Sequence, residues 1–480
     1  MPKLVAGVDS STQSCKVVIV EAETGHLVRE GRARHPEGTE VDPNSWWKAL
    51  QEAISEAGGL ADVAAISIGG QQHGMVALNA KGEVIRPALL WNDTRSAGAG
   101  DELVAHFGVD WLLANTGSVP VASFTSTKLR WLATKEPRNA AKVAAVMLPH
   151  DWLSWRLAGY GDKKSKLGPN FAAAWTDRSD ASGTGYFNAS KNTYVPEVID
   201  FCLGAGASAR VVLPRVLGKA EIGGKVFASE TIIGGGAGDN AGAAKGLGLE
   251  AGDAVVSIGT SGTVFAIADT AGTGALEIAG FADVDDRFLP LACTLNAAQV
   301  LDTFAAQLGV DFAEFERLAL SASPGADGLM LLPFFKGERT PNLPNAKASW
   351  HGVTLTNWTP ANIARAAIEG ILLSLANALE IFRQTGRPVL RVKLIGGAAA
   401  NHAVQQVAAG LFGGSIELPA ASEYVALGAA RQAADALGVD SSAWPIESRT
   451  ISAAAYDSAI LATFKARVAD EVSAAALLNH

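Results

Sequence analysis

Cysteine is scarce in this chain of 480 residues: only Cys15, Cys202 and Cys293 occur. They are far apart, odd in number and form no CxxC pair, so the sequence gives no support to a zinc or dithiol redox site. The same scarcity argues against a disulfide framework. We therefore expect a protein of a reducing compartment, with a cytoplasmic location.

Long apolar runs are also missing. No stretch reaches the roughly 18 uninterrupted apolar residues that are usual for a membrane helix. The first residues, MPKLVAGVDSS, lead directly into a short apolar strand and lack the apolar core of a signal peptide. We therefore expect neither a secretory leader nor a membrane partner.

The chain has no excess of positive charge. Its 39 Lys and Arg residues are outnumbered by 48 Asp and Glu residues, and the formal net charge is −9. Because no basic stripe is present to neutralise phosphates, nucleic acid is not an expected partner. A small phosphorylated ligand is still compatible with this balance, since backbone N–H groups and a metal ion can hold it.

The sequence does contain enough apolar material for two large domains. Hydrophobic residues make up 48% of the chain and charged residues 18%, and 480 residues exceed one ordinary core. Short β-branched runs alternate with longer helical patterns, which predicts an α/β fold. The predicted strands are 4–8, 16–20, 64–68, 144–148, 231–233, 254–258, 263–267 and 391–395, and the clearest predicted helices run from about 45 to 57 and from about 360 to 382.

A weak internal duplication divides the chain. Residues 4–25, LVAGVDSSTQSCKVVIVEAETG, are similar to residues 254–272, AVVSIGTSGTVFAIADTAG, since each has a strand, a small polar turn and a second strand. Such turns direct backbone N–H groups and hydroxyls at an anion. Two copies predict a nucleotide held between two domains, 1–245 and 246–480. The candidate phosphate-binding residues are Ser11, Thr12, Gln13, Lys16, Gly259, Thr260 and Ser261.

The sharpest local motif is TIIGGGAGDNAGAAKG, residues 231–246, in which a strand leads through glycines to Asp239 and a small-residue helix. An aspartate before a helix often serves only as a cap. A long glycine approach instead suits close contact with a ligand, so the interpretation of Asp239 as a cap alone is the weaker one. We expect the helix N-terminus to keep its carboxylate ionised near neutral pH.

Two other phosphate-binding motifs can be compared with this interpretation. Residues 236–241, GAGDNA, formally fit the G-x-G-x-x-A fingerprint of a dinucleotide-dependent oxidoreductase. Asp239 would then place a negative charge at the pyrophosphate, and the next strand, AVVSIG, lacks the acidic residue that holds the ribose. A Walker A loop is also absent, because residues 223–225, GGK, are followed by Val226. The dinucleotide function is therefore the weaker alternative.

Further polar groups follow the predicted strands. Asp9 ends the first strand beside the hydroxyl turn, and a carboxylate next to bound phosphate suits Mg²⁺, so Asp9 and Asp239 are the candidate metal ligands. In residues 391–401, RVKLIGGAAAN, a strand, a Gly-Gly turn and a helix start could hold an anion or a nucleotide edge. A plain strand-to-helix connection is the alternative interpretation.

Two clusters are typical of a sugar site. Gln72 and His73 lie in a glycine-flanked turn, and residues 91–95, WNDTR, combine an aromatic face with amide and charged groups. A structural histidine and an exposed loop with an Asp–Arg pair are the alternative interpretations. The candidate substrate contacts are Gln72, His73, Trp91, Asn92, Asp93, Asp239 and Asn240.

Taken together, these motifs resemble the FGGY family of carbohydrate kinases over essentially the whole chain. The segments that carry the resemblance are GVDSSTQSCK, DPNSWW, GGQQHG, LLWND-R, LPHDWLSWRLAG, SDASGTG, GGGAGDNAGAA, SIGTSG, LPFFKGERTP and LIGGAAAN, and residues 348–369 match the C-terminal signature of the family. The resemblance implies two ribonuclease-H-like domains of the actin-like ATPase superfamily, with the active site in the cleft between them.

The resemblance also implies a reaction: transfer of phosphate from ATP, with Mg²⁺, to a sugar hydroxyl. D-xylulose is the first expectation for the acceptor, and ribulose, fuculose, gluconate and glycerol are alternatives, as is a nucleotide-driven switch without a sugar. A homodimer is one expected assembly. The resemblance implies that Asp239 is the base and that Asp9 contacts magnesium. It also implies ketose contacts for Gln72 and His73, and it places Thr12 and Thr260 in the two phosphate hairpins. The residues that fall in its adenosine region are Gly396, Gly397, Ala398 and Asn401.

Overall fold

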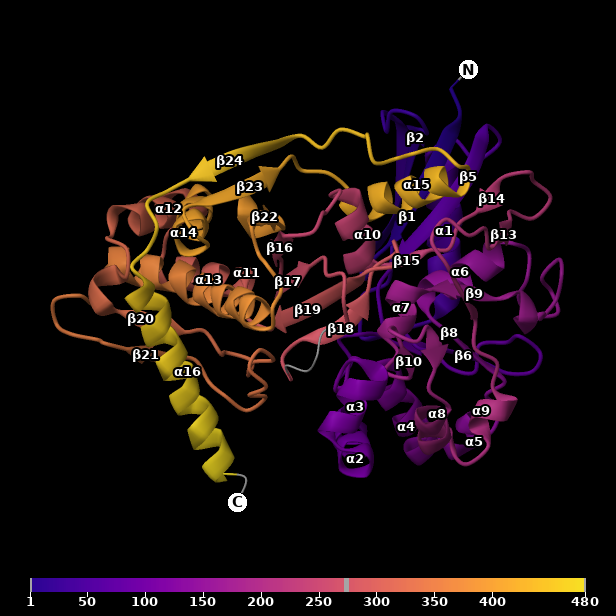
Figure 1. Ribbon diagram of the computed structural model, residues 1–480, viewed down its shortest axis with the longest axis horizontal. Helices are drawn as coiled ribbons and strands as arrows, with labels where there is room; N and C mark the ends of the chain where they lie inside the picture. Colours follow the sequence, from indigo (N-terminus) through magenta and orange to yellow (C-terminus); the bar gives the residue numbers. More distant parts are fainter. Residues whose placement is uncertain (1, 272–275, 479–480) are drawn as a thin grey trace.

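Two large β-sheets form the cores of the protein, and the computed structural model describes residues 2–271 and 276–478. Gly272, with which the second duplicated segment ends, lies outside the described residues. Figure 1 shows the first sheet on the right and the second in the middle of the molecule.

The first sheet is formed by the N-terminal half of the chain. Its strand order is β13-β14-β5-β1-β2-β3, and β15 pairs with the end of β5. The central strands are mostly Val, Ile and Ala because both faces of the sheet are buried. Its strands are β1 (Leu4–Ser10), β2 (Ser14–Glu21), β3 (Leu27–Arg34), β5 (Val63–Gly70), β13 (Gly224–Lys225), β14 (Ile232–Ile233) and β15 (Ala237–Gly238).

The second sheet is formed by the C-terminal half, in the order β18-β19-β17-β16-β22-β23-β24. Its strands are β16 (Asp253–Ile258), β17 (Gly262–Ala266), β18 (Ala279–Ala282), β19 (Phe288–Thr294), β22 (Arg391–Ile395), β23 (Ser415–Pro419) and β24 (Ser448–Ser452).

The two sheets repeat one arrangement of five strands. In the series β3-β2-β1-β5-β14 the first three strands are antiparallel neighbours and the last three are parallel neighbours. The series β19-β17-β16-β22-β23 has the same directions. This repeat is the ribonuclease-H-like pattern, and it confirms the predicted α/β class and the internal duplication. All eight predicted strands are present in the structure.

Helices cover the outer faces of both sheets. α1 (Pro43–Glu56) packs on β2 and β3, and its start is capped by Asp42, whose carboxylate accepts the N–H of Asn44. α13 (Pro360–Gln384) is almost entirely buried along one side and packs against the second sheet, α11 and α12. Both helices lie close to their predicted bounds.

Two helices, α10 (Asp239–Gly246) and α15 (Tyr424–Ala436), pack across each other in the region between the sheets (Figure 1). Glycine permits this crossing, because a Cβ on Gly246 would lie 2.0 Å from the carbonyl oxygen of Tyr424 and one on Gly428 would lie 1.9 Å from the carbonyl oxygen of Gly242. α15 packs on β1 and β5 although it follows the second sheet in sequence. The domain division at residue 245 stays a prediction, and α15 reaches across it.

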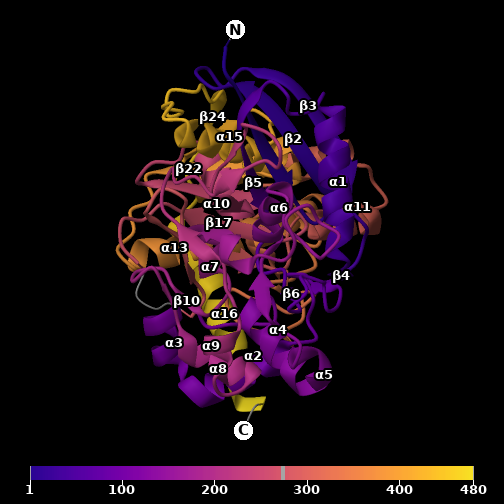
Figure 2. The same ribbon diagram turned by 90° about the vertical axis from the view of Figure 1, so that its right-hand side faces the viewer.

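The remaining elements connect and extend these layers. Figure 2 shows that α2–α5, α8 and α9 form a helical lobe at the end of the molecule away from β3, as they do in Figure 1. In the described part of the chain, no helix is long and apolar enough to cross a membrane. The other helices are α2 (Ala97–Phe107), α3 (Val109–Thr116), α4 (Thr125–Lys135), α5 (Pro137–Ala140), α6 (Pro149–Leu157), α7 (Arg178–Ser182), α8 (Pro196–Leu203), α9 (Ala207–Arg210), α11 (Ala298–Leu308), α12 (Phe312–Ser321), α14 (His402–Leu411) and α16 (Ser458–Leu478). The short strands are β4 (Glu40–Val41), β6 (Val76–Leu78), β7 (Ala88–Leu89), β8 (Ala145–Met147), β9 (Trp175–Asp177), β10 (Phe187–Asn188), β11 (Thr193–Tyr194), β12 (Arg215–Leu217), β20 (Met330–Leu332) and β21 (Ser349–His351), and the 3₁₀ turns are η1 (Phe171–Ala173), η2 (Ala326–Gly328) and η3 (Gly397–Ala400).

Candidate active site

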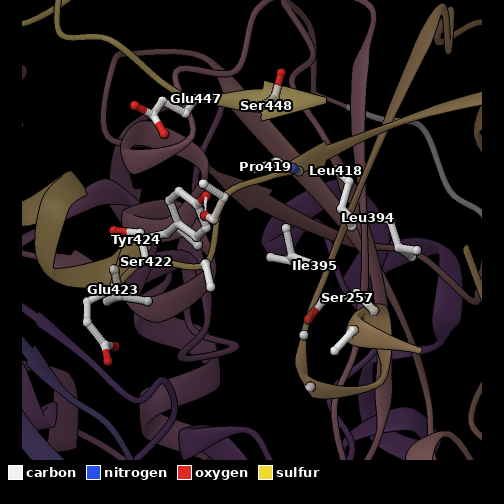
Figure 3. Close-up of a pocket in the computed structure, with 18 of the residues that line it drawn as sticks. Ser257, Leu394, Ile395, Leu418, Pro419, Ser422, Glu423, Tyr424, Glu447 and Ser448 are labelled. Carbon is white, nitrogen blue, oxygen red and sulfur yellow. Dashed lines mark hydrogen bonds between the residues drawn. The ribbon is translucent and has the colours of Figure 1, made fainter. Parts of the chain in front are cut away.

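A cavity of about 1060 Å³ opens between the two sheets. Asp9, at the end of β1, and Asp239, at the start of α10, line it from the first half. Gly396 and Gly397, which follow β22, line it from the second half. Figure 3 shows part of the second-half wall, with Glu423 and Tyr424 on one side and Ser257, Leu394 and Ile395 on the other. The structure therefore brings together residues that lie almost 400 positions apart.

Asp9 is a buried carboxylate beside the first hairpin turn. The Ser11 hydroxyl donates to its Oδ1 at 2.6 Å, and the Nζ of Lys16 lies 3.9 Å from its Oδ2. Burial raises the pKa of Asp9 to about 6, although the Ser11 hydrogen bond and the Lys16 charge both lower it. Lys16 itself forms an ion pair with Glu423, which precedes α15.

Asp239 is the first residue of α10, and its carboxylate faces the same cavity as Asp9. The backbone N–H and the side-chain amide of Asn240 each donate to Asp239 Oδ1 at 2.8 Å. Gly238 precedes Asp239, and a Cβ on Gly238 would lie 2.7 Å from the amide nitrogen of Gln72. The glycine approach is therefore needed for close packing under the carboxylate, in addition to any contact with a ligand.

The expected ionisation of Asp239 is wrong in one respect. Burial, with a smaller contribution from the Asp9 charge, raises the pKa of Asp239 to about 7 against the opposing hydrogen bonds from Asn240. The helix N-terminus, worth about half an elementary charge, does not outweigh the loss of hydration. The carboxyl group is therefore close to half protonated at neutral pH when no cation is bound.

Gln72 and His73 occupy the turn after β5 as predicted, but they differ in their surroundings. Gln72 is joined to the site, since Asn240 donates to its Oε1 at 3.4 Å and its own amide donates to the carbonyl of Ser179 at 3.3 Å. His73 has a φ of +67°, and its Nδ1 lies 2.5 Å from the carbonyl oxygen of Gly183. Burial lowers the pKa of His73 to about 3, so the ring is neutral and Nδ1 carries the proton.

Two of the predicted sugar contacts in the segment after β7, Trp91 and Asp93, form hydrogen bonds with other side chains of the protein. The indole N–H of Trp91 donates to the hydroxyl of Thr12 at 3.0 Å, so Trp91 braces the first hairpin. The Asp93 carboxylate accepts from Arg95 at 2.9 Å and from the hydroxyl of Thr39 at 2.8 Å. These bonds fit the Asp–Arg loop that was the alternative interpretation. Asn92 is exposed, and a sugar contact for these residues stays a prediction.

A second cavity, of about 590 Å³, adjoins the first at Gly397. Gly259 and Thr260, in the turn between β16 and β17, line it together with Ala398 and Asn401. The carbonyl of Gly259 accepts the backbone N–H of Ala298 at 2.9 Å, which fixes the turn against the start of α11. Asn401 caps α14, since its Oδ1 accepts the N–H of Val404 at 3.0 Å. Five of the predicted nucleotide residues thus surround one apolar space.

Several residues of the two cavities carry no local motif and were not predicted. Leu301, Asp302, Phe312 and Glu316 of α11 and α12 line the smaller cavity. Helical spacing is their main pattern, and that spacing equally suits a core face. Of the predicted nucleotide-binding residues, Ser11, Thr12, Gln13 and Ser261 lie on the two hairpin turns but line neither cavity. The predicted sugar contacts that line neither cavity are Gln72, His73, Trp91, Asn92 and Asp93.

Comparisons with known proteins match this chain along most of its length. Residues 4–246 match the model of the N-terminal domain, and residues 254–437 that of the C-terminal domain, of the FGGY family of carbohydrate kinases. A xylulose kinase of Streptomyces rubiginosus is 44% identical over 453 residues, covering 90% of this chain and 88% of the relative.

Solved structures agree with the sequence comparisons. The crystal structure of a xylulose kinase from Bifidobacterium adolescentis is 44% identical, has a TM-score of 0.92 and covers 97% of this chain and 99% of its own. A Plasmodium falciparum glycerol kinase with ADP has a TM-score of 0.83, with 99% and 98% of the chains covered. At 19% identity, that likeness concerns the fold alone.

Proposed function

Because the chain belongs to the FGGY family of carbohydrate kinases, we propose that it transfers the γ-phosphoryl group of ATP to O5 of D-xylulose. The enzyme class, a sugar kinase, follows from the family. The choice of acceptor is supported by the relatives that are 44% identical over most of the chain, which are named for xylulose. The observation that carries the proposal is the shared cavity of Asp9, Asp239 and the Gly396–Gly397 turn.

In the proposed reaction Asp239 accepts the proton of the sugar hydroxyl. The hydroxyl oxygen forms a bond to the γ-phosphorus, the bond between that phosphorus and the bridging oxygen of ADP breaks, and the proton passes to the Asp239 carboxylate. A pKa of about 7 suits a general base near neutral pH, because the group is substantially ionised and still basic enough to accept a proton. Asn240 holds the carboxylate through two hydrogen bonds.

The site also fits a magnesium ion. Mg²⁺ prefers carboxylate, phosphate and water oxygens, and Asp9 and Asp239 present two carboxylates to one cavity. The negative charge of Asp9 contributes to the raised pKa of Asp239. A divalent cation bound between the two carboxylates would neutralise this repulsion. When bound there, the ion would offset the charge of the phosphate oxygens. Because Asp239 is the proposed base, Asp9 is the candidate that is free to serve as the ligand.

We infer that the smaller cavity holds the adenine ring. Its walls come from Ile258, Leu301 and Phe312, which offer apolar surface to a flat base, and Asn401 adds a polar group at its edge. Gly397 lines both cavities, so a nucleotide seated in the smaller one could extend its phosphates toward the larger one. Since ATP is the donor, we expect the enzyme to work in the cytoplasm. The homodimer stays a prediction.

The proposal can be tested by measuring ADP release with Mg·ATP and a panel of D-xylulose, D-ribulose, L-fuculose, gluconate and glycerol. We expect the highest kcat/KM with D-xylulose and a 5-phosphate as the product in ³¹P NMR. Asp239→Asn should lower kcat by roughly 10²–10⁴-fold, as loss of a general base does, with the sugar KM changed far less. ADP release that is indifferent to added sugar would favour the nucleotide switch, and a better acceptor in the panel would overturn the choice of xylulose.

A further inference from the structure

A buried cluster of four ionisable groups lies beneath the turn that carries Asp239, outside both cavities. His150, near the start of α6, is fully buried, and its Nε2 lies 3.3 Å from Asp151, 3.3 Å from Asp177 and 3.2 Å from Asp180. The two ring nitrogens of His150 and both carboxylate oxygens of Asp180 lack a hydrogen-bond partner among the described residues. Nothing in the proposed reaction uses this cluster.

The charges of the cluster require a cation. Asp177 caps α7 and accepts from the N–H and the hydroxyl of Ser179 and from the N–H of Asp180. Asp151 accepts the N–H of Leu148 at 2.8 Å. These donors satisfy oxygens of Asp177 and Asp151, while burial raises the pKa of Asp151 to about 6. Buried carboxylates without a counter-charge are strongly unfavourable. Within the described chain, His150 is the one basic side chain within 4.0 Å of these three carboxylates.

The carboxyl groups around His150 favour the charged form of its ring. Burial opposes a charged ring, but the charge of Asp151 and the interaction with Asp177 lead the effects that outweigh it and raise the pKa of His150 to about 9. Burial and the neighbouring carboxylates raise the pKa of Asp180 well above its usual value, so Asp180 is the group that keeps a proton. Burial, with a smaller contribution from the nearby carboxylates, raises the pKa values of Tyr186 and Tyr194, so both phenols stay neutral.

The cluster is in direct contact with the catalytic turn. Gly236 has a φ of +94°, and a Cβ built on it would lie 2.3 Å from Nδ1 of His150. The imidazole ring therefore packs directly against the backbone of the turn. A chain of hydrogen bonds leads from the cluster to the site. The Ser179 hydroxyl donates to Asp177 at 2.5 Å and accepts the N–H of Gly238 at 3.0 Å, and the Ser179 carbonyl accepts from Gln72.

We propose that His150 is an imidazolium in the folded enzyme and acts as a positioning residue for Asp239. Its charge holds Asp177 in place, Asp177 orients Ser179, and Ser179 fixes both the residue before Asp239 and the amide of Gln72. The role assigned to Asp239 rests on the proposed function, whereas the charge of His150 does not. Asp180 interacts electrostatically with Asp239 across the turn. Because Asp180 keeps its proton, it adds no negative charge that would oppose ionisation of Asp239.

The charge of His150 can be tested first, without any assay of activity. In ¹⁵N-histidine-labelled protein, the ring nitrogens of His150 should both carry protons at pH 8, above the ordinary pKa of histidine. A neutral His150 ring at pH 8 would overturn the proposal. Metal analysis of the same protein, purified and then dialysed without chelator, should show no ion that depends on His150. A stoichiometric divalent ion that is lost in His150→Lys would overturn it as well.

The positioning role can be tested with His150→Gln, His150→Lys and the control His26→Gln. Gln removes the charge and should lower kcat by on the order of 10- to 100-fold, because a base displaced by about 1 Å costs that much. The KM for ATP should stay within about twofold, since the adenine cavity is remote. Lys restores a buried cation and should recover most of the lost kcat. Equal kcat in the Gln variant and the wild type, or a Lys variant no better than Gln in folded protein, would refute the role.

These outcomes are distinguishable from a failure of the proposed function. If the panel of sugars gave no phosphorylation at all, the ¹⁵N measurement would still decide the charge of His150. If the enzyme phosphorylated a sugar but Asp239→Asn kept full activity, the base assignment would fail while the charge stood. Circular dichroism and thermal unfolding of each variant would separate a loss of folding from a loss of positioning.

Discussion

Replacing the proposed base should stabilise the protein at the same time as it stops the reaction. The pKa of Asp239 is raised from 3.8 to about 7 in the folded protein, mainly by burial. A carboxyl group with a raised folded-state pKa contributes most stability below its unfolded pKa, near 4, and loses it as the pH rises through 7. In the wild type this group therefore destabilises the folded protein increasingly as the pH rises from about 4 to about 7, and Asp239→Asn lacks that pH-dependent cost.

The size of this effect follows from linkage. With pKa values of about 7 folded and about 3.9 unfolded, the ionisable group costs about 1.6 kcal/mol at pH 5 and about 4 kcal/mol at pH 8, as upper limits. Between these two pH values, Asp239→Asn should therefore gain about 2–3 kcal/mol relative to wild type. Asn keeps the oxygen that accepts from Asn240, so the hydrogen bonds at Oδ1 are preserved.

The measurement is thermal and urea unfolding at pH 5, 6.5 and 8, with EDTA and without nucleotide, because a bound cation would lower the pKa. Asp110→Asn is the matched control, since Asp110 is an exposed carboxylate in the first turn of α3. We expect the Tm of the Asp239 variant to rise above wild type at pH 8 and to approach it at pH 5, with the control flat. A variant that is equally or less stable at pH 8 would refute the assignment of a half-buried base with a raised pKa.

Two further predictions address the nucleotide site and the helix crossing. Ala398→Leu should fill part of the smaller cavity and raise the KM for ATP by about tenfold or more, while the sugar KM changes little; an unchanged ATP KM would place adenine elsewhere. Gly246→Ala should lower the Tm by several degrees, since its Cβ would lie 2.0 Å from a backbone oxygen of Tyr424, whereas Gly98→Ala, with open space around its Cβ, should be neutral or stabilising. Equal Tm values for the two glycine variants would show that the α10–α15 crossing tolerates expansion.

The fold was predictable where its signals are local. The buried strands β1, β5 and β16 are continuous apolar runs, and the caps of α1 and α13, Asp42 and Thr359, lie next to a proline at the helix start. The edge strand β3 was not predicted, because its sequence, LVREGRAR, alternates charged and small residues that are mostly exposed. The helical lobe between β7 and β12, which has a buried apolar cluster of its own, was not predicted in detail.

The site was predictable in part. Asp9, Asp239 and the two small polar hairpin turns stand out because unusual residues cluster at strand ends. The structure gathers Asp9, Asp239 and the Gly396–Gly397 turn around one cavity. The walls of the smaller cavity could not be identified, since Leu301 and Phe312 lie on amphipathic helices of ordinary composition. The ionisation of Asp239 was predicted incorrectly, because helix position is local information and burial is not.

The sequence alone determined which short segments turn sharply, which are buried strands, and that one hairpin design occurs twice, because these depend on residues within a few positions of each other. Tertiary structure decided how those segments meet. Gln432 of α15 binds both the N–H and the carbonyl of Gly236, at 2.9 and 2.7 Å, across 196 positions of sequence. His150 acquires its charge only when three carboxylates surround it in the dry interior. Electrostatic energies depend on distance and hydration, and folding sets both.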